Sequence, residues 1–315
     1  MTAGPPGDGG VRIGLSAVVI GMRDAQAAVL TAPVDSREAA LPFGPFDPVR
    51  DRTFERALRD FVTAQTGFRP GFVEQLYTFG DAGRASPRAT PGPSGAREVS
   101  VGYLALTVDA VDPPGAEARW APVLDFFPWE DHRRGRPALL APLIERLERW
   151  AGTDDRRRLR VQTLFATGPD ARWSESRVLE RYELLYEAGL VAEAARDRDQ
   201  TPPALAPGRA MASDHRRILA TGLGRLRSKL RYRPVLFDLT PSTFTLSQLQ
   251  AAAEAVAGIA LHKQNFRRGV ERTGLVAPTG GFSTGTGGRP AALFRATGVD
   301  PADGQAPGLP LPIQR

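Results

Sequence analysis

Four polar side chains near the C-terminal end of the chain have the chemistry to bind DNA: Lys263, Gln264, Arg267 and Arg268. Arginine and lysine pair with guanine edges, glutamine pairs with adenine, and the remaining cations can hold phosphates. Phe266 and Val270 lie one turn apart, which predicts a helix from about His262 to Arg272 that buries both apolar residues. The four polar residues then share the free face of that helix.

Another amphipathic helix is expected just before this one. Thr245 is placed to act as its N-cap, and Gln248, three residues later, completes a capping box. Its apolar stripe consists of Leu246, Leu249, Ala253 and Val256. Gly258 ends the helix, and residues 259–261 form a short turn. Two short helices joined by a tight turn, the second of them basic, are typical of a helix-turn-helix whose second helix lies in the DNA major groove.

Residues 275–294 predict a wing beside the two helices. We expect one strand at 275–277, a Gly-rich tip at 280–288 and a return strand at 291–294, with Arg289 at the base. The two helices alone would fit a solvated basic surface equally well. The wing and the distribution of charge favour nucleic-acid binding.

The charge of the chain is unevenly distributed. The net charge is +6, but residues 206–297 hold 14 Lys and Arg against four Asp and Glu, a balance of +10. The remainder holds 27 basic and 31 acidic residues, a balance of −4. A basic helix is expected at His215–Arg231, docked between two domains with Arg225, Arg227 and Lys229 facing solvent or phosphate. A cationic C-terminal part on a mildly acidic body is typical of a modular nucleic-acid binder.

Other classes of function find little support in the composition. Cysteine is absent, and the three histidines match no metal-binding spacing, so we expect no metal site. No apolar run is long enough to span a membrane, and the N-terminus lacks the pattern of a signal peptide. We therefore expect a cytoplasmic protein with no membrane partner. The Pro- and Gly-rich ends, 1–10 and 298–315, are expected to be disordered.

The N-terminal half predicts a sheet with helices. Strands are expected at 11–20, 27–30, 72–79, 98–108 and 159–165, and helices from Thr53 to Gly67, at 138–150 and from Ser174 to about Ala188. The run from Asp131 to Arg134 could form a ligand or oligomer contact, or simply a solvated loop. Clustered Pro and Gly at 197–210 predict a linker.

Several motifs resemble those of a known family. The LPFGPF loop, a helix ending in TG-F and the strand REVSVGYLAL resemble the Nudix fold, and RVLERYELLYEAGLV resembles the last helix of that domain in bacterial regulators. RYRPVLFDLTPSTFTLSQLQ, HKQNFRRGVE and GGRPAALFR resemble the winged helix of the Nudix-related transcriptional regulators of NAD metabolism. The resemblance covers about residues 11–295. It implies an α/β protein with a Nudix-like α/β/α sandwich at 11–196 and a winged helix-turn-helix domain at 211–297.

The chain departs from the Nudix motif where catalysis would need metal ligands. With Gly67 and Phe68 at the end of the motif, Ala64 and Gln65 stand at the positions of the paired glutamates, and Asp60 precedes Phe61 where Arg-Glu is expected. Nudix hydrolysis needs several carboxylates to hold divalent cations. We therefore expect no catalytic residues and no enzyme activity. The alternatives are a Nudix hydrolase of ADP-ribose or a dinucleotide with an appended basic domain, and a module that serves only for dimerisation.

The resemblance also implies partners and site residues. It implies a repressor of NAD biosynthesis genes that senses ADP-ribose or a related nucleotide and needs no cofactor, and a homodimer that binds a palindromic operator in double-stranded DNA. The residues expected to contact DNA are Thr245, Lys263, Gln264, Asn265, Arg267, Arg268 and Arg289. The residues expected to line the sensor pocket are Phe43, Gly44, Arg97 and Tyr103. Asn265 could instead orient the start of its helix.

Overall fold

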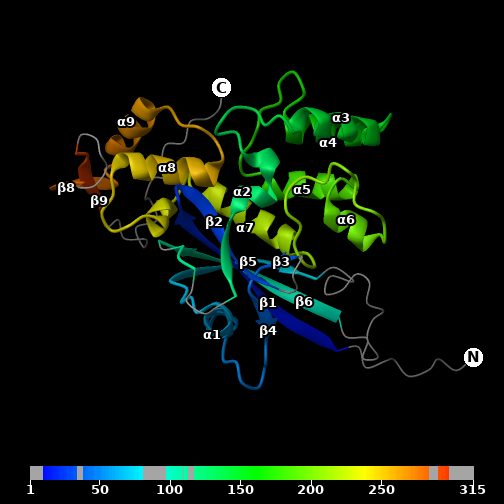
Figure 1. Ribbon diagram of the computed structural model, residues 1–315, viewed down its shortest axis with the longest axis horizontal. Coiled ribbons are helices and arrows are strands. Elements are labelled where there is room, and N and C mark those ends of the chain that lie inside the picture. The colour runs from blue at the N-terminus through cyan, green and yellow to red at the C-terminus, as the bar shows by residue number, and fades with distance from the viewer. Residues whose placement is uncertain are drawn as a thin grey trace, which may run out of the picture.

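A mixed β-sheet forms the centre of the N-terminal half in this computed structural model (Figure 1), which describes residues 10–33, 38–80, 97–108, 110–112, 117–283 and 290–297. Its strands are β1 (Val11–Arg23), β2 (Gln26–Pro33), β3 (Ala39–Ala40), β4 (Phe43–Pro45), β5 (Phe72–Phe79), β6 (Arg97–Thr107) and β7 (Arg119–Pro122). The order is β3-β2-β1-β6-β5, with β4 paired to β1 and β7 to β2. Only the β1–β6 pairing is parallel among the described strands of this sheet.

A two-residue turn joins β1 and β2 into a hairpin. The strands extend to Arg23 and resume at Gln26, so only Asp24 and Ala25 remain in the turn. Both have positive φ, 49° and 58°. Two central residues with φ above zero match the twist of the strands they join.

Helix α1 (Phe54–Thr66) covers one face of the sheet, and its predicted ends are confirmed. The Thr53 hydroxyl accepts a hydrogen bond from the Arg56 backbone N–H, and Gly67 closes the helix at φ 72°. Its apolar side buries Leu58 and Val62 against the same cluster as Leu15 and other odd-numbered residues of β1.

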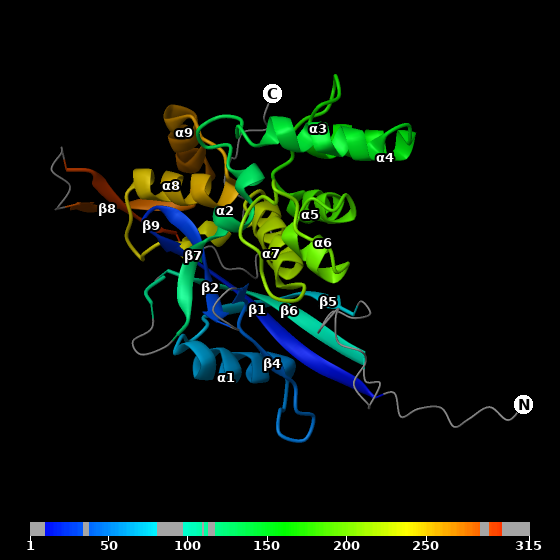
Figure 2. The ribbon, with the colours of Figure 1, turned by 45° about the vertical axis from the view of Figure 1, so that its right-hand side comes forward.

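Helix α7 (His215–Lys229) covers the opposite face, which gives the predicted α/β/α sandwich (Figure 2). Gly222 allows the close approach, because a Cβ there would lie 2.9 Å from Cγ1 of Val18. The predicted place of this helix between the two parts is confirmed, because it packs on β1, β5 and β6 of the sheet and also contacts α8 of the C-terminal part. The predicted exposure of Arg227 and Lys229 is wrong, since both are buried.

Helices fill the segment between β7 and α7. They are α2 (Val123–Phe126), the 3-10 helix η1 (Pro128–Glu130), α3 (Leu140–Ala151), α4 (Asp155–Phe165), α5 (Val178–Glu187) and α6 (Ala192–Asp197). The strand predicted at 159–165 is wrong, because Asp154 caps α4 by accepting from the backbone N–H groups of Arg156 and Arg157. The predicted cap at Ser174 is wrong as well, because 174–177 form a turn and α5 begins at Val178.

The C-terminal part contains the predicted helix-turn-helix and wing. It comprises the 3-10 helix η2 (Val235–Leu239), α8 (Leu246–Ala257), α9 (Lys263–Thr273), β8 (Val276–Phe282) and β9 (Ala292–Ala296). Strand β8 runs further than predicted and includes Gly280. One apolar core continues from Val18 of the sheet to Val270 of α9, so the two parts pack as a unit.

Two further expectations concern membrane spans and the ends of the chain. Within the described residues, no helix is long and apolar enough to cross a membrane. The tails predicted at 1–10 and 298–315 lie outside the described residues, apart from Gly10.

Candidate DNA-binding surface and ligand pockets

Helix α9 presents its polar side to solvent, as predicted. Phe266 and Val270 are buried, while Lys263, Gln264, Asn265 and Arg268 are exposed. None of the cations on α9 forms an ion pair with another described residue. These side chains therefore project from one helix with their charges available to an anionic partner.

Arg267 differs from its neighbours on α9. It is half-buried, and its Nη2 donates to the Ser247 hydroxyl of α8 at 3.1 Å. Its Nε is buried without a hydrogen-bond partner among the described residues. Arg267 thus joins the two helices of the helix-turn-helix, in addition to any contact with DNA.

Thr245 has a structural role at the start of α8, the first helix of the helix-turn-helix. Its hydroxyl accepts from the Gln248 backbone N–H at 3.2 Å, and the Gln248 side chain accepts from the Thr245 backbone N–H at 2.8 Å. The predicted capping box is confirmed, and Thr245 is buried. Arg289, the other predicted contact outside α9, lies outside the described residues.

The wing is fixed to the helices by a third short strand segment. Phe244, just before α8, exchanges two backbone hydrogen bonds with Phe294 of β9, at 2.9 and 2.8 Å. The ring of Phe244 is buried and stacks on Phe237 at 5.7 Å. The strand β9 therefore has a defined position relative to the start of α8.

A buried ion-pair network attaches α8 to the rest of the molecule. Glu130 is fully buried, and its carboxylate accepts a hydrogen bond from Arg181 Nε at 2.6 Å and another from Arg227 Nη1 at 2.6 Å. Burial opposes ionisation of Glu130, but the charges and hydrogen bonds of the two arginines hold its pKa below the ordinary value. Arg227 also donates from Nε to the Val256 carbonyl of α8 at 2.8 Å. The network, which we name the Glu130 cluster, thereby joins α5, α7 and the end of α8.

The loop after η1 makes a second attachment to α8. The His132 backbone N–H donates to the carbonyl of Gly258, the C-cap of α8, at 2.7 Å. Gly258 has φ 72°, and a Cβ there would lie 2.4 Å from the Glu130 carbonyl oxygen. Only glycine fits this position. The sequence indicated the helix end at Gly258 but gave no sign of its contact with residues 130–132.

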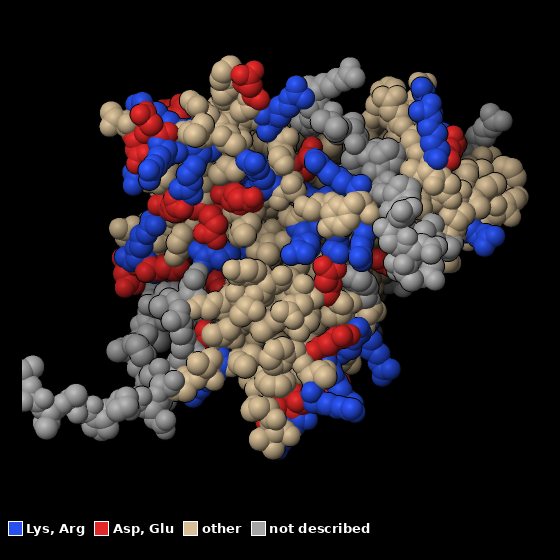
Figure 3. All heavy atoms as spheres, turned by 180° about the vertical axis from the view of Figure 1, so that it is seen from behind, with Lys and Arg blue, Asp and Glu red and all other residues tan. Residues whose placement is uncertain are grey.

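Most cations of the basic helix α7 are neutralised by acidic residues of the preceding segments. Arg216 pairs with Glu193, Arg217 with Glu183, Lys229 with Glu74 and Arg227 with Glu130, and Arg231 just beyond the helix pairs with Glu175. In the rear view, positive and negative side chains also lie interspersed over the helical part (Figure 3). The +10 balance of residues 206–297 therefore overstates the charge available to a nucleic acid.

The predicted sensor residues do not all lie on one face of the sheet. Tyr103 is buried in the cluster under α1, where burial and then the charge of Glu55 raise its pKa, and Gly44 lies against the ring of Phe61 of α1. Phe43 pairs with Ser16 on β1, and its ring contacts His215 of α7 at 5.1 Å. The structure thus brings Gly44 and Tyr103 to the α1 side and Phe43 to the α7 side. Arg97 is the first residue of β6, where its backbone pairs with Val11.

The exposed side of α1 offers few carboxylates. Glu55 pairs with Arg59 at 2.8 Å, and Asp60 lies 3.9 Å from Arg56. Gln65 clamps β4 instead of holding a cation: its Nε2 donates to the Phe43 carbonyl at 2.6 Å, and its Oε1 accepts from the Phe43 N–H at 3.3 Å. Among the described residues, no three His, Cys, Asp or Glu side chains gather into a metal site.

Comparison with known families identifies the C-terminal part. Residues 236–296, from η2 to the end of β9, match the family described as the NrtR DNA-binding winged helix domain. This segment is an NrtR-type winged helix. A curated relative, the "ADPR responsive transcriptional repressor NtrR" of Acinetobacter baylyi, is 39% identical over 85 residues. That match spans 27% of this chain and 34% of the relative, so the chain aligns with about a third of the relative's length.

Solved structures show the same fold over most of the chain. NrtR of Shewanella oneidensis, crystallised with a 27mer DNA, has a TM-score of 0.54 and 20% identity, with 90% of this chain and 93% of that chain covered. A MutT/nudix family protein from Enterococcus faecalis has a TM-score of 0.52 and 14% identity over 94% of this chain and 90% of its own. The fold shared with these proteins therefore includes both the N-terminal sheet with its helices and the winged helix that follows it.

Proposed function

We propose that the protein is a DNA-binding transcriptional repressor that responds to ADP-ribose, with NAD biosynthesis genes as its targets. The observation that carries the proposal is the exposed polar face of α9 in an NrtR-type winged helix. The Acinetobacter baylyi relative is a repressor that responds to ADP-ribose, and the Shewanella oneidensis structure holds DNA. Both support the same assignment.

In the proposed complex α9 lies in the major groove. Gln264 and Asn265 are exposed amides that can pair with adenine, while Lys263, Arg267 and Arg268 can pair with guanine or hold phosphates. A homodimer would present two such helices to a palindromic operator, with half-sites one or two helical turns apart. Residues 211–297 would form the DNA-binding domain, although α7 within that range covers the sheet.

Fluorescence anisotropy tests the proposal directly. Purified protein is titrated into labelled DNA from upstream of its own gene and of NAD biosynthesis genes, at one stated salt concentration, with and without ADP-ribose. We expect tight, sequence-selective binding that ADP-ribose reverses. Equal binding to a shuffled sequence, unaffected by ADP-ribose, would contradict the proposal.

We further propose that the sheet-and-α1 part senses the effector without hydrolysing it. Support comes from α1, where Gln65 is engaged with Phe43 and the carboxylates of Glu55 and Asp60 face arginines. Gly44 and Tyr103, which lie on the α1 side, are candidate pocket residues. Arg97, the first residue of β6, is a further candidate. Incubating the protein with ADP-ribose and magnesium or manganese should yield no AMP, whereas release of AMP at an enzymatic rate would favour a Nudix hydrolase. A rise in melting temperature with ADP-ribose would report binding.

A further inference from the structure

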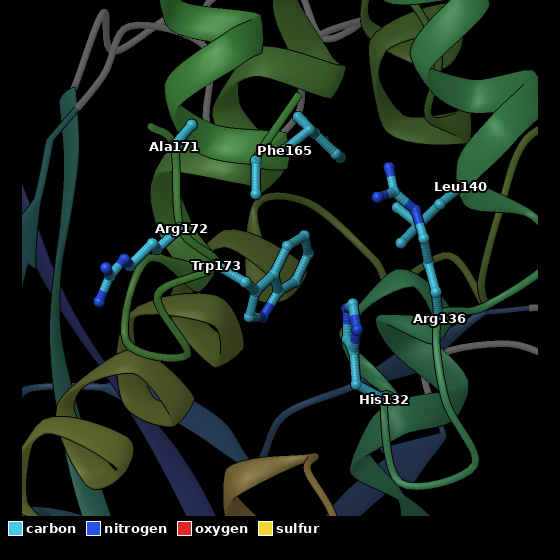
Figure 4. Close-up of a pocket in the computed structure, with 8 residues that line it drawn as sticks. His132, Arg136, Leu140, Phe165, Ala171, Arg172 and Trp173 are labelled. Atoms are coloured by element: carbon cyan, nitrogen blue, oxygen red, sulfur yellow. The ribbon is translucent and has the colours of Figure 1, made fainter. Parts of the chain in front are cut away.

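A cavity of about 290 Å³ opens between α3, the end of α4 and the loop that leads to α5. Its wall combines three aromatic side chains, His132, Phe165 and Trp173, with Leu140. Two arginines, Arg136 and Arg172, complete the lining (Figure 4). Concave sites with a mostly apolar wall and a few polar groups are where small molecules bind.

The aromatic wall is held in place from behind. The guanidinium of Arg181 lies 3.9 Å from the centre of the Trp173 ring, on the side of the Glu130 cluster. The His132 ring contacts Trp173 with centroids 4.2 Å apart, and Phe165 meets Trp173 edge-on at 6.4 Å. The wall is therefore preorganised, so a ligand would spend little free energy on ordering it.

One polar atom of this wall has no hydrogen-bond partner among the residues that the structure describes. Nε2 of His132 is buried and makes no hydrogen bond with the described residues. Burial lowers the pKa of His132, although the charge of Glu130 opposes the shift, so the surroundings favour the neutral imidazole. Buried polar atoms in native proteins almost always have partners. Nε2 of His132 therefore keeps a hydrogen-bonding capacity that a ligand or a water molecule in the cavity would satisfy.

The two arginines of the lining indicate that a ligand of this cavity would be negatively charged. Arg136 and Arg172 are exposed at the lining of the cavity, and neither forms an ion pair with a described residue. In Figure 4 the Arg136 side chain extends past Leu140 on one side, and Arg172 extends away on the other. Guanidinium groups bind carboxylates and phosphates with charge-assisted hydrogen bonds.

We propose that this cavity is a binding site for a small aromatic anion, separate from the α1 side of the sheet. The aromatic body would lie against Phe165, Leu140 and Trp173, and the anionic group would pair with Arg136. An aromatic carboxylate and a nucleoside monophosphate share this chemistry. The site adjoins the attachment of α8, because His132 also holds Gly258.

Histidine NMR on the full chain tests the site without relying on DNA binding. The chain has three histidines, so the imidazole spectrum should contain three resolved signals, and His132→Gln assigns the one from the cavity. The probes are benzoate, its neutral counterpart benzamide, AMP and inorganic phosphate. We expect benzoate or AMP to shift the His132 signal in a saturable way, while those of His215 and His262 stay in place.

Matched ligands and variants make the outcome decisive. Benzamide and inorganic phosphate should bind at least about tenfold more weakly than benzoate or AMP, which corresponds to about 1.4 kcal/mol. Arg136→Ala should weaken binding by a similar factor, whereas Arg134→Ala, an exposed neighbour that does not line the cavity, should not. Response to benzoate alone would identify a carboxylate site, and response to AMP alone a nucleotide site.

Three results would overturn the proposal. They are a His132 signal that no probe moves at millimolar concentration, equal binding of benzamide and benzoate, and equal losses in Arg136→Ala and Arg134→Ala. The signal comes from His132 in the cavity. The test therefore does not depend on whether ADP-ribose binds on the α1 side of the sheet.

Discussion

Helices α7 and α9 are both basic, but their cations face different surroundings. Arg216, Arg227 and Lys229 of α7 are buried and paired with carboxylates, whereas Lys263 and Arg268 of α9 are exposed and have no ion-pair partner among the described residues. The cations of α7 lie against the acidic N-terminal part of the molecule. Those of α9 lie on the outer face of the winged helix.

This difference shows why a charge count cannot locate a DNA-binding surface. A cation that is already paired with a carboxylate does not neutralise a DNA phosphate and so releases no counterions from the DNA. It therefore adds little to the affinity for DNA. Buried pairs instead make the folded state depend on both partners, because removing one leaves a desolvated charge. Substitutions on α7 and in its partners should therefore act on stability, and substitutions on α9 should act on DNA binding.

Glu130→Gln should have the largest effect on stability. The substitution keeps the shape of the side chain but leaves Arg181 and Arg227 buried without a counter-charge. We expect the free energy of unfolding to fall by about 3–5 kcal/mol, measured by urea denaturation. Glu145→Gln is the control, since Glu145 pairs with Arg149 on the exposed side of α3. Similar losses in both variants would show that burial of the cluster does not matter.

The same cluster should make stability sensitive to acid. The pKa of Glu130 is lowered in the folded protein, so its contribution is fully present above the unfolded pKa and is lost as pH falls through the folded value. The difference in unfolding free energy between wild type and Glu130→Gln should be constant near neutral pH. Below about pH 4.5, the ordinary value, it should shrink. A difference that stays constant down to pH 3 would exclude ionised Glu130 as its source.

Local signals made the winged helix predictable from the sequence. Thr245, Gln248 and Gly258 mark the ends of α8, and Phe266 and Val270 mark the buried side of α9. Each of these signals depends on residues within one or two turns. The fold of this part and the exposure of the polar face of α9 follow from them.

The features that could not be predicted from the sequence depend on long-range contacts and on the register of strand pairing. Arg227 meets Glu130 across 97 positions, and no spacing rule connects them. Leu159–Phe165 has β-branched residues that suggest a strand, but the cap at Asp154 and the buried side of Val161, Leu164 and Phe165 make it part of a helix. Phe43 and Tyr103 fall on opposite faces because of the pairing of β4 and β6 with β1, which their local sequences do not specify.

Substitution of α9 cations should weaken DNA binding without loss of stability. Arg268→Ala should lower affinity by about 1–3 kcal/mol if Arg268 contacts a base, or reduce the salt dependence by about one counterion if it holds a phosphate. Arg225→Ala on α7 is the matched control, because Arg225 is partly exposed but lies 3.7 Å from Glu74. Anisotropy at several salt concentrations measures both. Equal losses in the two variants would mean that α7 also contacts DNA.

Thr245→Ala should produce the smallest change and separates capping from DNA contact. Loss of the hydroxyl removes the bond from the Gln248 N–H, so the free energy of unfolding should fall by about 1 kcal/mol. Thr245→Ser keeps the hydroxyl and should retain most of the stability. Because Thr245 is buried, DNA affinity measured where both variants are folded should match that of wild type. Weaker DNA binding by Thr245→Ala with unchanged stability would instead make Thr245 a contact residue and move the DNA-binding surface from α9 toward the start of α8.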